Sequence, residues 1–267
     1  MSLFHTSGMK KREEKKYFDK EWKAMKSSLS TFFKKEAQED LHHFRVQVKK
    51  LRAFIILSDS TDHHPNLAQH FKPVKKIFKE AGEIRNAYVN QQLAKAHQPA
   101  SNDFMSSQHQ LQTDATTRFK SMKVKHLEKI KDAHAIIKGK IGSISNVHTS
   151  LFYQNLLKQI SGTLANLKFN EALHDCRKQV KILIYNHKLV HTVLAIGFNE
   201  DYLHQVQTAI GDWHDNVLAI ELYSGDKTMV TNLKKQGTKL KRDITALTKD
   251  FFNQATTVVE LPVEQLS

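Results

Sequence analysis

Apolar side chains recur every three or four residues along most of the chain, with polar and charged side chains between them. The first such segment covers residues 10–35, and its apolar positions are Tyr17, Trp22, Met25, Leu29 and Phe33. This spacing puts the apolar side chains on one side of an α-helix and the intervening lysines on the other. The segment is expected to be an amphipathic helix with one buried face.

Residues that favour turns interrupt this pattern at a few places only. The chain has 9 glycines and 4 prolines among 267 residues, so helix breakers are scarce and the helices are expected to be long. The pattern predicts an all-α protein of roughly eight helices. The predicted breaks lie around Pro65, around Pro99, and at residues 139–146, 197–199 and 225–226.

The chain also contains a long internal repeat. Residues 41–49 resemble residues 173–181, and a second match in the same order pairs residues 82–86 with residues 211–215. Two related halves are therefore predicted, each with about four helices, in which short connections favour antiparallel neighbours. The expected fold is two packed four-helix bundles within one domain, with repeats at about 1–142 and 143–267.

The charge of the chain favours anionic partners. There are 41 Lys and Arg against 27 Asp and Glu, which gives a formal net charge of +14 before any of the 16 histidines is protonated. Such a field attracts nucleic acid, anionic lipid, acidic protein or phosphate polymers alike, because Coulomb forces depend on charge and not on chemistry. The charge alone does not choose among these partners.

Cysteine content and the apolar segments restrict other classes of function. Cys176 is the only cysteine, so the chain has no intrachain disulfide and no zinc site built on several thiolates. The N-terminus lacks the apolar stretch of a signal peptide, and no apolar run reaches the length of a membrane span. A cytoplasmic protein without membrane association is expected.

Two helices are predicted to carry a basic stripe opposite an apolar face. A rotation of 100° per residue places four basic positions of the helix predicted to begin near Glu39 within an arc of roughly 80°. Phe44, Val48 and Leu51 fall on a separate arc, and Cys176 belongs to the matching apolar face of the second half, where it is expected to be core. The two stripes are His42, Arg45, Lys49 and Arg52, and His174, Arg177, Lys181 and Lys188.

Further basic residues share faces on other predicted helices. Like charges at this spacing repel by a few tenths of a kcal/mol per pair, and a bound polyanion would relieve the repulsion. The arginine fork suits phosphate, and lysine adds a mobile point charge. The alternative for any single stripe is a solvated basic face. These stripes are Lys72, Lys75 and Lys79; Arg118, Lys125 and Lys129; and Lys235, Lys239 and Arg242.

Repeated glycines and histidines accompany the stripes. Gly82 and Gly211 fall where helices are expected to continue, which indicates a close approach of another backbone segment or a local kink, the alternative being a tolerated glycine. The histidines His42, His174 and His214 suit several roles: donating to phosphate, binding a metal, exchanging protons, or packing.

At these residues the sequence resembles the conserved histidine α-helical domain, the CHAD family, over nearly its whole length. The family is marked by a His-x-x-Arg-x-x-x-Lys helix and a later Gly-x-x-Arg-Asp segment, each present twice. Here the first mark falls on His42, Arg45, Lys49 and Arg52, and on His174, Arg177 and Lys181. The second falls on Gly82, Arg85 and Asn86, and on Gly211, His214 and Asp215.

The resemblance implies two pseudosymmetric four-helix bundles around a basic central channel that binds inorganic polyphosphate without catalysis or a cofactor. It also implies a cytoplasmic protein associated with polyphosphate granules. The chain departs from the family pattern where Ile184 matches Arg52, where Asn86 replaces an acid and where His214 replaces an arginine. The second half is therefore expected to bind less tightly or with more dependence on pH. No Glu-x-Glu-x-Lys triphosphatase motif is present, which indicates a stand-alone module.

Three other functions are weighed against polyphosphate binding. The His-Asp pairs at 174–175 and 214–215 suggest a metal-dependent phosphohydrolase, but the matching positions 42–43 and 85–86 lack the carboxylate that a metal needs. Membrane-surface binding would need apolar faces that a bundle already uses. Nucleic acid is the most serious alternative ligand, and it is expected to bind more weakly than polyphosphate. Against it, the aromatic residues occupy apolar helix positions and do not form platforms for base stacking. Those aromatic residues are Phe44, Phe54, Phe78 and Phe119.

Overall fold

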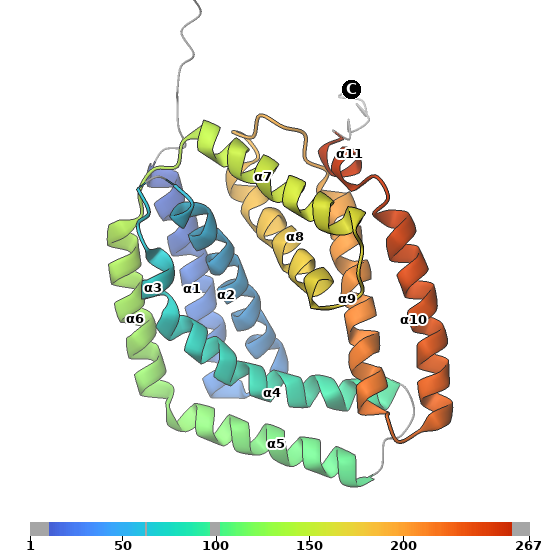
Figure 1. Cartoon of the computed structure of the whole chain (residues 1–267). Helices are drawn as coiled ribbons and strands as arrows, with labels where there is room; N and C mark the ends of the chain where they lie inside the picture. The colour runs from blue at the N-terminus through green and yellow to red at the C-terminus, as the bar shows by residue number, and fades with distance from the viewer. Residues whose placement is uncertain (1–10, 62, 97–101, 258–267) are drawn as a thin grey trace, which may run out of the picture. The chain divides into compact units, whose positions relative to one another are not determined.

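The computed structural model describes residues 11–61, 63–96 and 102–257. All regular secondary structure in these ranges is helical, in eleven helices and with no strand (Figure 1). This confirms the all-α fold class. The predicted break around Pro99 lies outside these ranges. Within them, no helix is long and apolar enough to cross a membrane.

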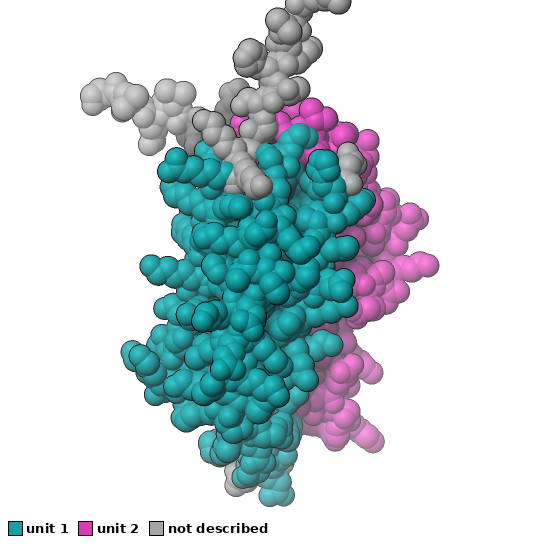
Figure 2. Space-filling view, turned by 90° about the vertical axis from the view of Figure 1, so that its left-hand side faces the viewer, with its two compact units in different colours: residues 1–145 teal, residues 146–267 magenta. Residues whose placement is uncertain are grey.

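The chain divides into two compact units, residues 1–145 and 146–267, which Figure 2 colours teal and magenta. Unit 1 contains five long helices and one short turn of helix, one long helix more than expected. The predicted internal duplication and central channel stay predictions. The helices of unit 1 are α1 (Lys11–Lys35), α2 (Gln38–Asp59), α3 (Leu67–His70), α4 (Lys72–Ala96), α5 (Asn102–Ser121) and α6 (Lys123–Lys140).

Helix α1 presents the apolar face that its spacing predicts. Met25 and Leu29 are fully buried and Trp22 and Phe33 nearly so, whereas Tyr17 is only half-buried and Phe18 takes the buried place beside it. This face packs along α2, α2 packs against α4, and α4 packs along α5. The packing sets α2 and α4 side by side, with the basic stripe of α2 next to the helix that carries Gly82.

The extra helix in unit 1 comes from a break between α5 and α6 that contains neither glycine nor proline. The hydroxyl of Ser121 donates to the carbonyl oxygen of Arg118 at 2.8 Å, which is the local side-chain contact that competes with a continuing helix. Met122 follows with φ −92° and ψ 8°, outside the helical region. The apolar period alone does not signal this break.

Unit 2 comprises α7 (Asn146–Ala165), α8 (Glu171–Val190), α9 (Glu200–Leu222), α10 (Lys227–Leu247) and α11 (Phe251–Thr256). Helix α8 packs between α7 and α9, and α9 lies between α8 and α10 (Figure 1). The predicted turns at 197–199 and 225–226 are confirmed. Each ends in a side chain that caps the next helix: Asn199 accepts from Tyr202 N at 3.0 Å, and Asp226 from Met229 N at 2.9 Å.

Cys176 lies on α8 with 1% of its surface exposed, which confirms its predicted place in the core. Burial raises the pKa of its thiol to about 12. A thiol in this state is protonated and unreactive at neutral pH. The buried side of α8 thus faces the core of unit 2, and its basic stripe occupies another side of the same helix.

Candidate anion-binding site

The basic stripe on α2 is partly built into the packing between α2 and α4. His42, Arg45 and Lys49 are half-buried, whereas Arg52 is exposed. Nη1 of Arg45 donates to the carbonyl oxygen of Phe78 on α4 at 2.7 Å. The guanidinium carbon also lies 4.1 Å from the centre of the Phe78 ring, within the range of a cation–π contact. Arg45 is therefore held on the backbone and ring of the neighbouring helix.

Gly82 leaves room for this contact. It follows Phe78 by four residues, so its own N–H is the regular helical partner of the Phe78 carbonyl. A Cβ atom at position 82 would lie only 2.8 Å from Nη1 of Arg45. A group does approach Gly82 closely, but it is an arginine side chain and not the backbone that the sequence led us to expect.

Unit 2 contains the same arrangement in the same register. Nε of Arg177 on α8 donates to the carbonyl oxygen of Gln207 on α9 at 2.8 Å, and Gly211 follows Gln207 by four residues. A Cβ atom at position 211 would lie 2.6 Å from Nη2 of Arg177. Each unit thus anchors one arginine on a helix carbonyl beside a glycine.

Cations crowd the anchored arginine of unit 1. Burial, and after it the charge of Arg85, lowers the pKa of Arg45 to about 10. The pKa of His42 is lowered as well, first by burial and then by Arg85. Arg45 keeps its charge at neutral pH, in a partly dehydrated place where a further cation raises its energy. A bound anion would favour the charged forms of Arg45 and His42 and so raise the pKa of both side chains.

The matching group in unit 2 has a different balance of charge. Burial and then Arg177 lower the pKa of Lys181 to about 8, against the opposing influence of Asp215. The rings of His174 and His214 lie 4.2 Å apart between centroids, and burial followed by His214 lowers the pKa of His174. Burial raises the pKa of Asp215. At the two positions of the group that differ, unit 2 has His214 and Asp215 where unit 1 has Arg85 and Asn86.

The structure brings only some of the predicted site residues together. In unit 1 these are His42, Arg45, Lys49 and Arg85, and in unit 2 His174, Arg177, Lys181 and His214. Arg118 is exposed and pairs with Glu83 of α4 at 2.9 Å, and Lys129 is half-buried. The other predicted cations lie on exposed faces: Arg52, Lys72, Lys75, Lys79, Lys125, Lys188, Lys235, Lys239 and Arg242.

The α10 group is separated from the anchored arginine of its own unit. Lys235, Lys239 and Arg242 lie on a helix that packs against α9, and α9 stands between α10 and α8 (Figure 1). Their shared exposed face agrees with the predicted stripe. It is a second basic surface of unit 2, and it does not extend the stripe of Arg177.

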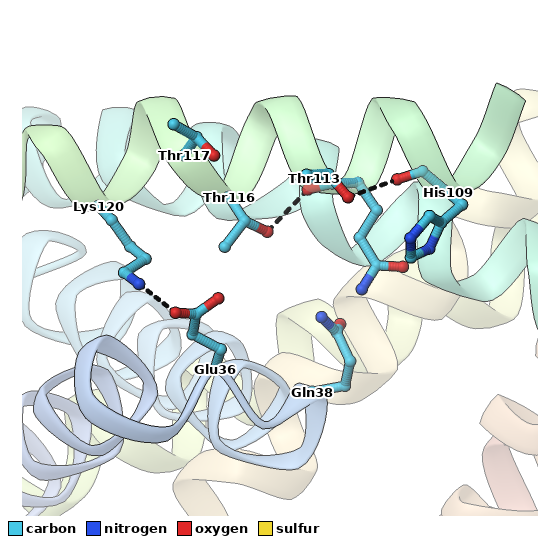
Figure 3. Close-up of a pocket in the computed structure, with 8 residues that line it drawn as sticks. Glu36, Gln38, His109, Thr113, Thr116, Thr117 and Lys120 are labelled. Carbon is cyan, nitrogen blue, oxygen red and sulfur yellow. Dashed lines mark hydrogen bonds and ion pairs between the residues drawn. The ribbon is translucent and has the colours of Figure 1, made fainter. Parts of the chain in front are cut away.

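A hollow of about 340 Å³ opens elsewhere in unit 1, between the α1–α2 junction and α5 (Figure 3). Glu36 of the junction forms an ion pair with Lys120 of α5 across it. The charges of this pair cancel, so the hollow has no excess of positive charge to attract an anion. None of the predicted site residues lines it. The remaining lining residues are Gln38, His109, Gln112, Thr113, Thr116 and Thr117.

The His-Asp pairs were also candidates for metal binding. Among residues 11–61, 63–96 and 102–257, no group of three or more His, Cys, Asp and Glu residues is arranged to hold a metal ion. Asp175 instead pairs with Lys178 at 2.8 Å, which lowers the pKa of that carboxyl group.

The sequence does not indicate the backbone partners of Arg45 and Arg177, which are the carbonyl oxygens of Phe78 and Gln207. Every residue has a backbone carbonyl, so no residue type marks one that accepts a side chain. The available signal was the glycine, because both repeated glycines follow such a carbonyl by four residues.

These features define a class of all-helical proteins in which repeated basic helix faces carry an arginine anchored beside a glycine. The family model described as CHAD domain matches residues 16–224, and the chain belongs to the CHAD family. The crystal structure of the CHAD domain from the plant Ricinus communis is similar, with a TM-score of 0.67 and 15% sequence identity over 97% of each chain. At that identity the likeness shows the fold alone. The comparison with curated proteins found no match.

Proposed function

We propose that this protein binds inorganic polyphosphate through the basic faces of α2 and α8, without chemical turnover. The observation that carries the proposal is the anchored arginine of each unit, Arg45 and Arg177, set among half-buried cations. Membership of the CHAD family supports the same ligand class. The exposed stripes on the other helices would add long-range attraction for a polyanion.

The chemistry of the site suits non-bridging phosphate oxygens. A guanidinium has five N–H donors, so the carbonyl contact leaves most of them for phosphate. Lys49 and Lys181 lie one helical turn further along the same helices as Arg45 and Arg177, and a lysine ammonium tolerates a chain whose oxygens differ in position. Because these cations are already partly dehydrated, an anion gains more interaction energy there than at a fully solvated lysine.

Nucleic acid is the second candidate, on the grounds of charge alone. Of the aromatic residues that the basic segments offer, Phe44, Phe54 and Phe119 are buried and Phe78 lies under Arg45. None of the four is placed as a platform on which a base could stack. These four residues therefore add no stacking contact to the attraction between the basic faces and the phosphate backbone of nucleic acid. Polyphosphate presents the same phosphate groups without intervening sugars and bases.

Competition at about 150 mM salt tests the choice between these ligands. Labelled long-chain polyphosphate is bound first, and single-stranded RNA, duplex DNA and short phosphates are added as competitors. We expect polyphosphate to stay bound at a large excess of nucleic acid. Displacement by nucleic acid at equal phosphate concentration would instead identify a general polyanion binder.

A pair of charge-matched variants tests the site. R45A/K49A removes two cations from the α2 stripe, and the control K23A/K26A removes two exposed lysines of α1. We expect the first variant to lose far more affinity for polyphosphate than the second, and equal losses would show that net charge acts without a site. Phosphorus-31 NMR of the bound polymer checks the absence of turnover, because chain shortening would reveal hydrolysis.

A further inference from the structure

We propose that Gly82 and Gly211 are positioning residues, which bind no ligand themselves but hold Arg45 and Arg177 in the orientation that receives phosphate. The inference rests on the proposed function, and it adds to the site two residues that act through the arginines and do not touch the ligand. Each guanidinium is oriented by its hydrogen bond to a helix carbonyl, and it reaches that carbonyl through the space that the glycine leaves.

The argument begins with helix geometry. The Cβ of a helical residue points toward the helix N-terminus and lies beside the carbonyl oxygen four residues earlier. That oxygen has two lone pairs, and the helical N–H uses one of them. Some approaches to the other lone pair avoid the Cβ, as in the contact of the Tyr153 hydroxyl with the Leu183 carbonyl at 2.8 Å, four residues before His187. The guanidinium groups of Arg45 and Arg177 instead occupy the space where the Cβ of the fourth residue would lie. Glycine at the fourth position after the carbonyl leaves that space open.

The other helical glycines show that the relation is specific. A Cβ atom at Gly139 or Gly162 would meet nothing within 4 Å, and the structure gives neither glycine an inserted side chain. At Gly237 the crowding recurs, since a Cβ atom there would lie 2.6 Å from Oδ1 of Asn216. Nδ2 of Asn216 donates to the carbonyl oxygen of Leu233 at 3.1 Å, again four residues before the glycine. Crowded glycines and accepted side chains thus occur together.

The contact of Asn216 differs in its role from the contacts of Arg45 and Arg177. Asn216 is 8% exposed and uncharged, so its contact joins α9 to α10 inside unit 2 and offers nothing to a ligand. Arg45 and Arg177 are half-exposed cations. Because a guanidinium is planar and rigid, one N–H held on a carbonyl fixes the plane, and with it the direction of the remaining donors. Because these donors are already fixed in the free protein, binding costs less side-chain conformational entropy.

The test measures polyphosphate affinity in the variants G82A and G211A, with G162A as the matched control. An added Cβ displaces the guanidinium without removing its charge. Loss of one fixed long side chain is expected to weaken binding roughly three- to tenfold in each of the two variants. G162A should bind like the wild type. G237A controls for packing, with lower stability and unchanged affinity, and thermal unfolding of each variant shows that the fold persists.

A double-mutant cycle separates positioning from a general disturbance of α4. If Gly82 acts only through Arg45, the change G82A costs no further affinity in an R45A background. An equal loss in both backgrounds, or no loss from G82A when R45A does weaken binding, would overturn the positioning role and leave the proposed function standing. Failure of the wild type to bind polyphosphate would refute the proposed function itself.

Discussion

Lys181 should make the affinity of unit 2 for polyphosphate fall as the pH rises above 8. Its pKa of about 8 reflects burial and the nearby charge of Arg177, so the free protein loses this cation in mildly alkaline solution. A bound phosphate favours the charged ammonium and raises the pKa again. Binding therefore takes up a proton above pH 8, and the affinity must decrease as protons become scarce.

The size of the effect follows from proton linkage. If phosphate restores the pKa of Lys181 to about 10, the affinity at pH 9 is about ninefold lower than at pH 7.

The free energy of unfolding should increase with pH, in contrast to the affinity. The pKa of Lys181 in the folded protein lies below the ordinary value, near 10.4, that it has in the unfolded chain. The neutral form is thus favoured on folding, and stability increases as the pH rises from about 8 to about 10.5.

The assay is a titration of polyphosphate at pH 7, 8 and 9 with R45A/K49A, in which binding depends on unit 2. The control adds K181R, because an arginine keeps its charge throughout this range. We expect the decrease in affinity to disappear in the K181R variant. A decrease of the same size with and without K181R would refute the assignment, since another group would then supply the proton.

Three further predictions concern stability and are measured by urea unfolding. G162A should raise the free energy of unfolding by about 0.5–1 kcal/mol, because alanine favours the helix and nothing crowds its Cβ, whereas a loss there would contradict the open space beside it. N216A should lower it by about 0.5–1.5 kcal/mol, because the Leu233 carbonyl loses its side-chain donor and keeps only its helical one, and an unchanged value would show that the contact is not formed. Glu36 has φ 57°, a conformation that glycine adopts without strain. E36G should therefore stabilise unit 1 by up to about 1 kcal/mol despite the lost ion pair with Lys120, and a net loss would mean that the ion pair outweighs the backbone strain.

The sequence predicted those features that depend on residue type and period. The apolar face of α1, the capped turns before α9 and α10, and the buried position of Cys176 all follow from side-chain polarity and helix geometry. The two repeated glycines also indicated a special local contact, because glycine weakens a helix and its repetition within predicted helices calls for a structural explanation. For Gly82 and Gly211 that explanation is the contact with an arginine side chain.

Features that depend on tertiary packing were beyond the sequence. A local feature, the break at Met122, was not predicted either, because many helices contain a hydroxyl contact like that of Ser121 without ending. The lowered pKa of Lys181 needs burial beside Arg177, and the period alone places that lysine on a polar face like any other. The ion pair of Arg118 with Glu83 depends on how the neighbouring helices α4 and α5 are rotated against each other, and the apolar period does not say which polar side chains meet.

The two units differ where their sequences differ, and the difference gives each a distinct expected behaviour. At the two positions that differ most, unit 1 has the guanidinium of Arg85 and the uncharged amide of Asn86. The matching positions of unit 2 hold His214 and Asp215, and Asp215 lies close enough to oppose the lowered pKa of Lys181. D215N should therefore increase the affinity of unit 2 for polyphosphate at pH 7 by removing a charge that repels the ligand. The same change should lower the pKa of Lys181 further, so the loss of affinity begins at a lower pH. An increase in affinity without that shift would separate the two roles of Asp215, and no change in either would show that its carboxyl group is already neutral in the folded protein.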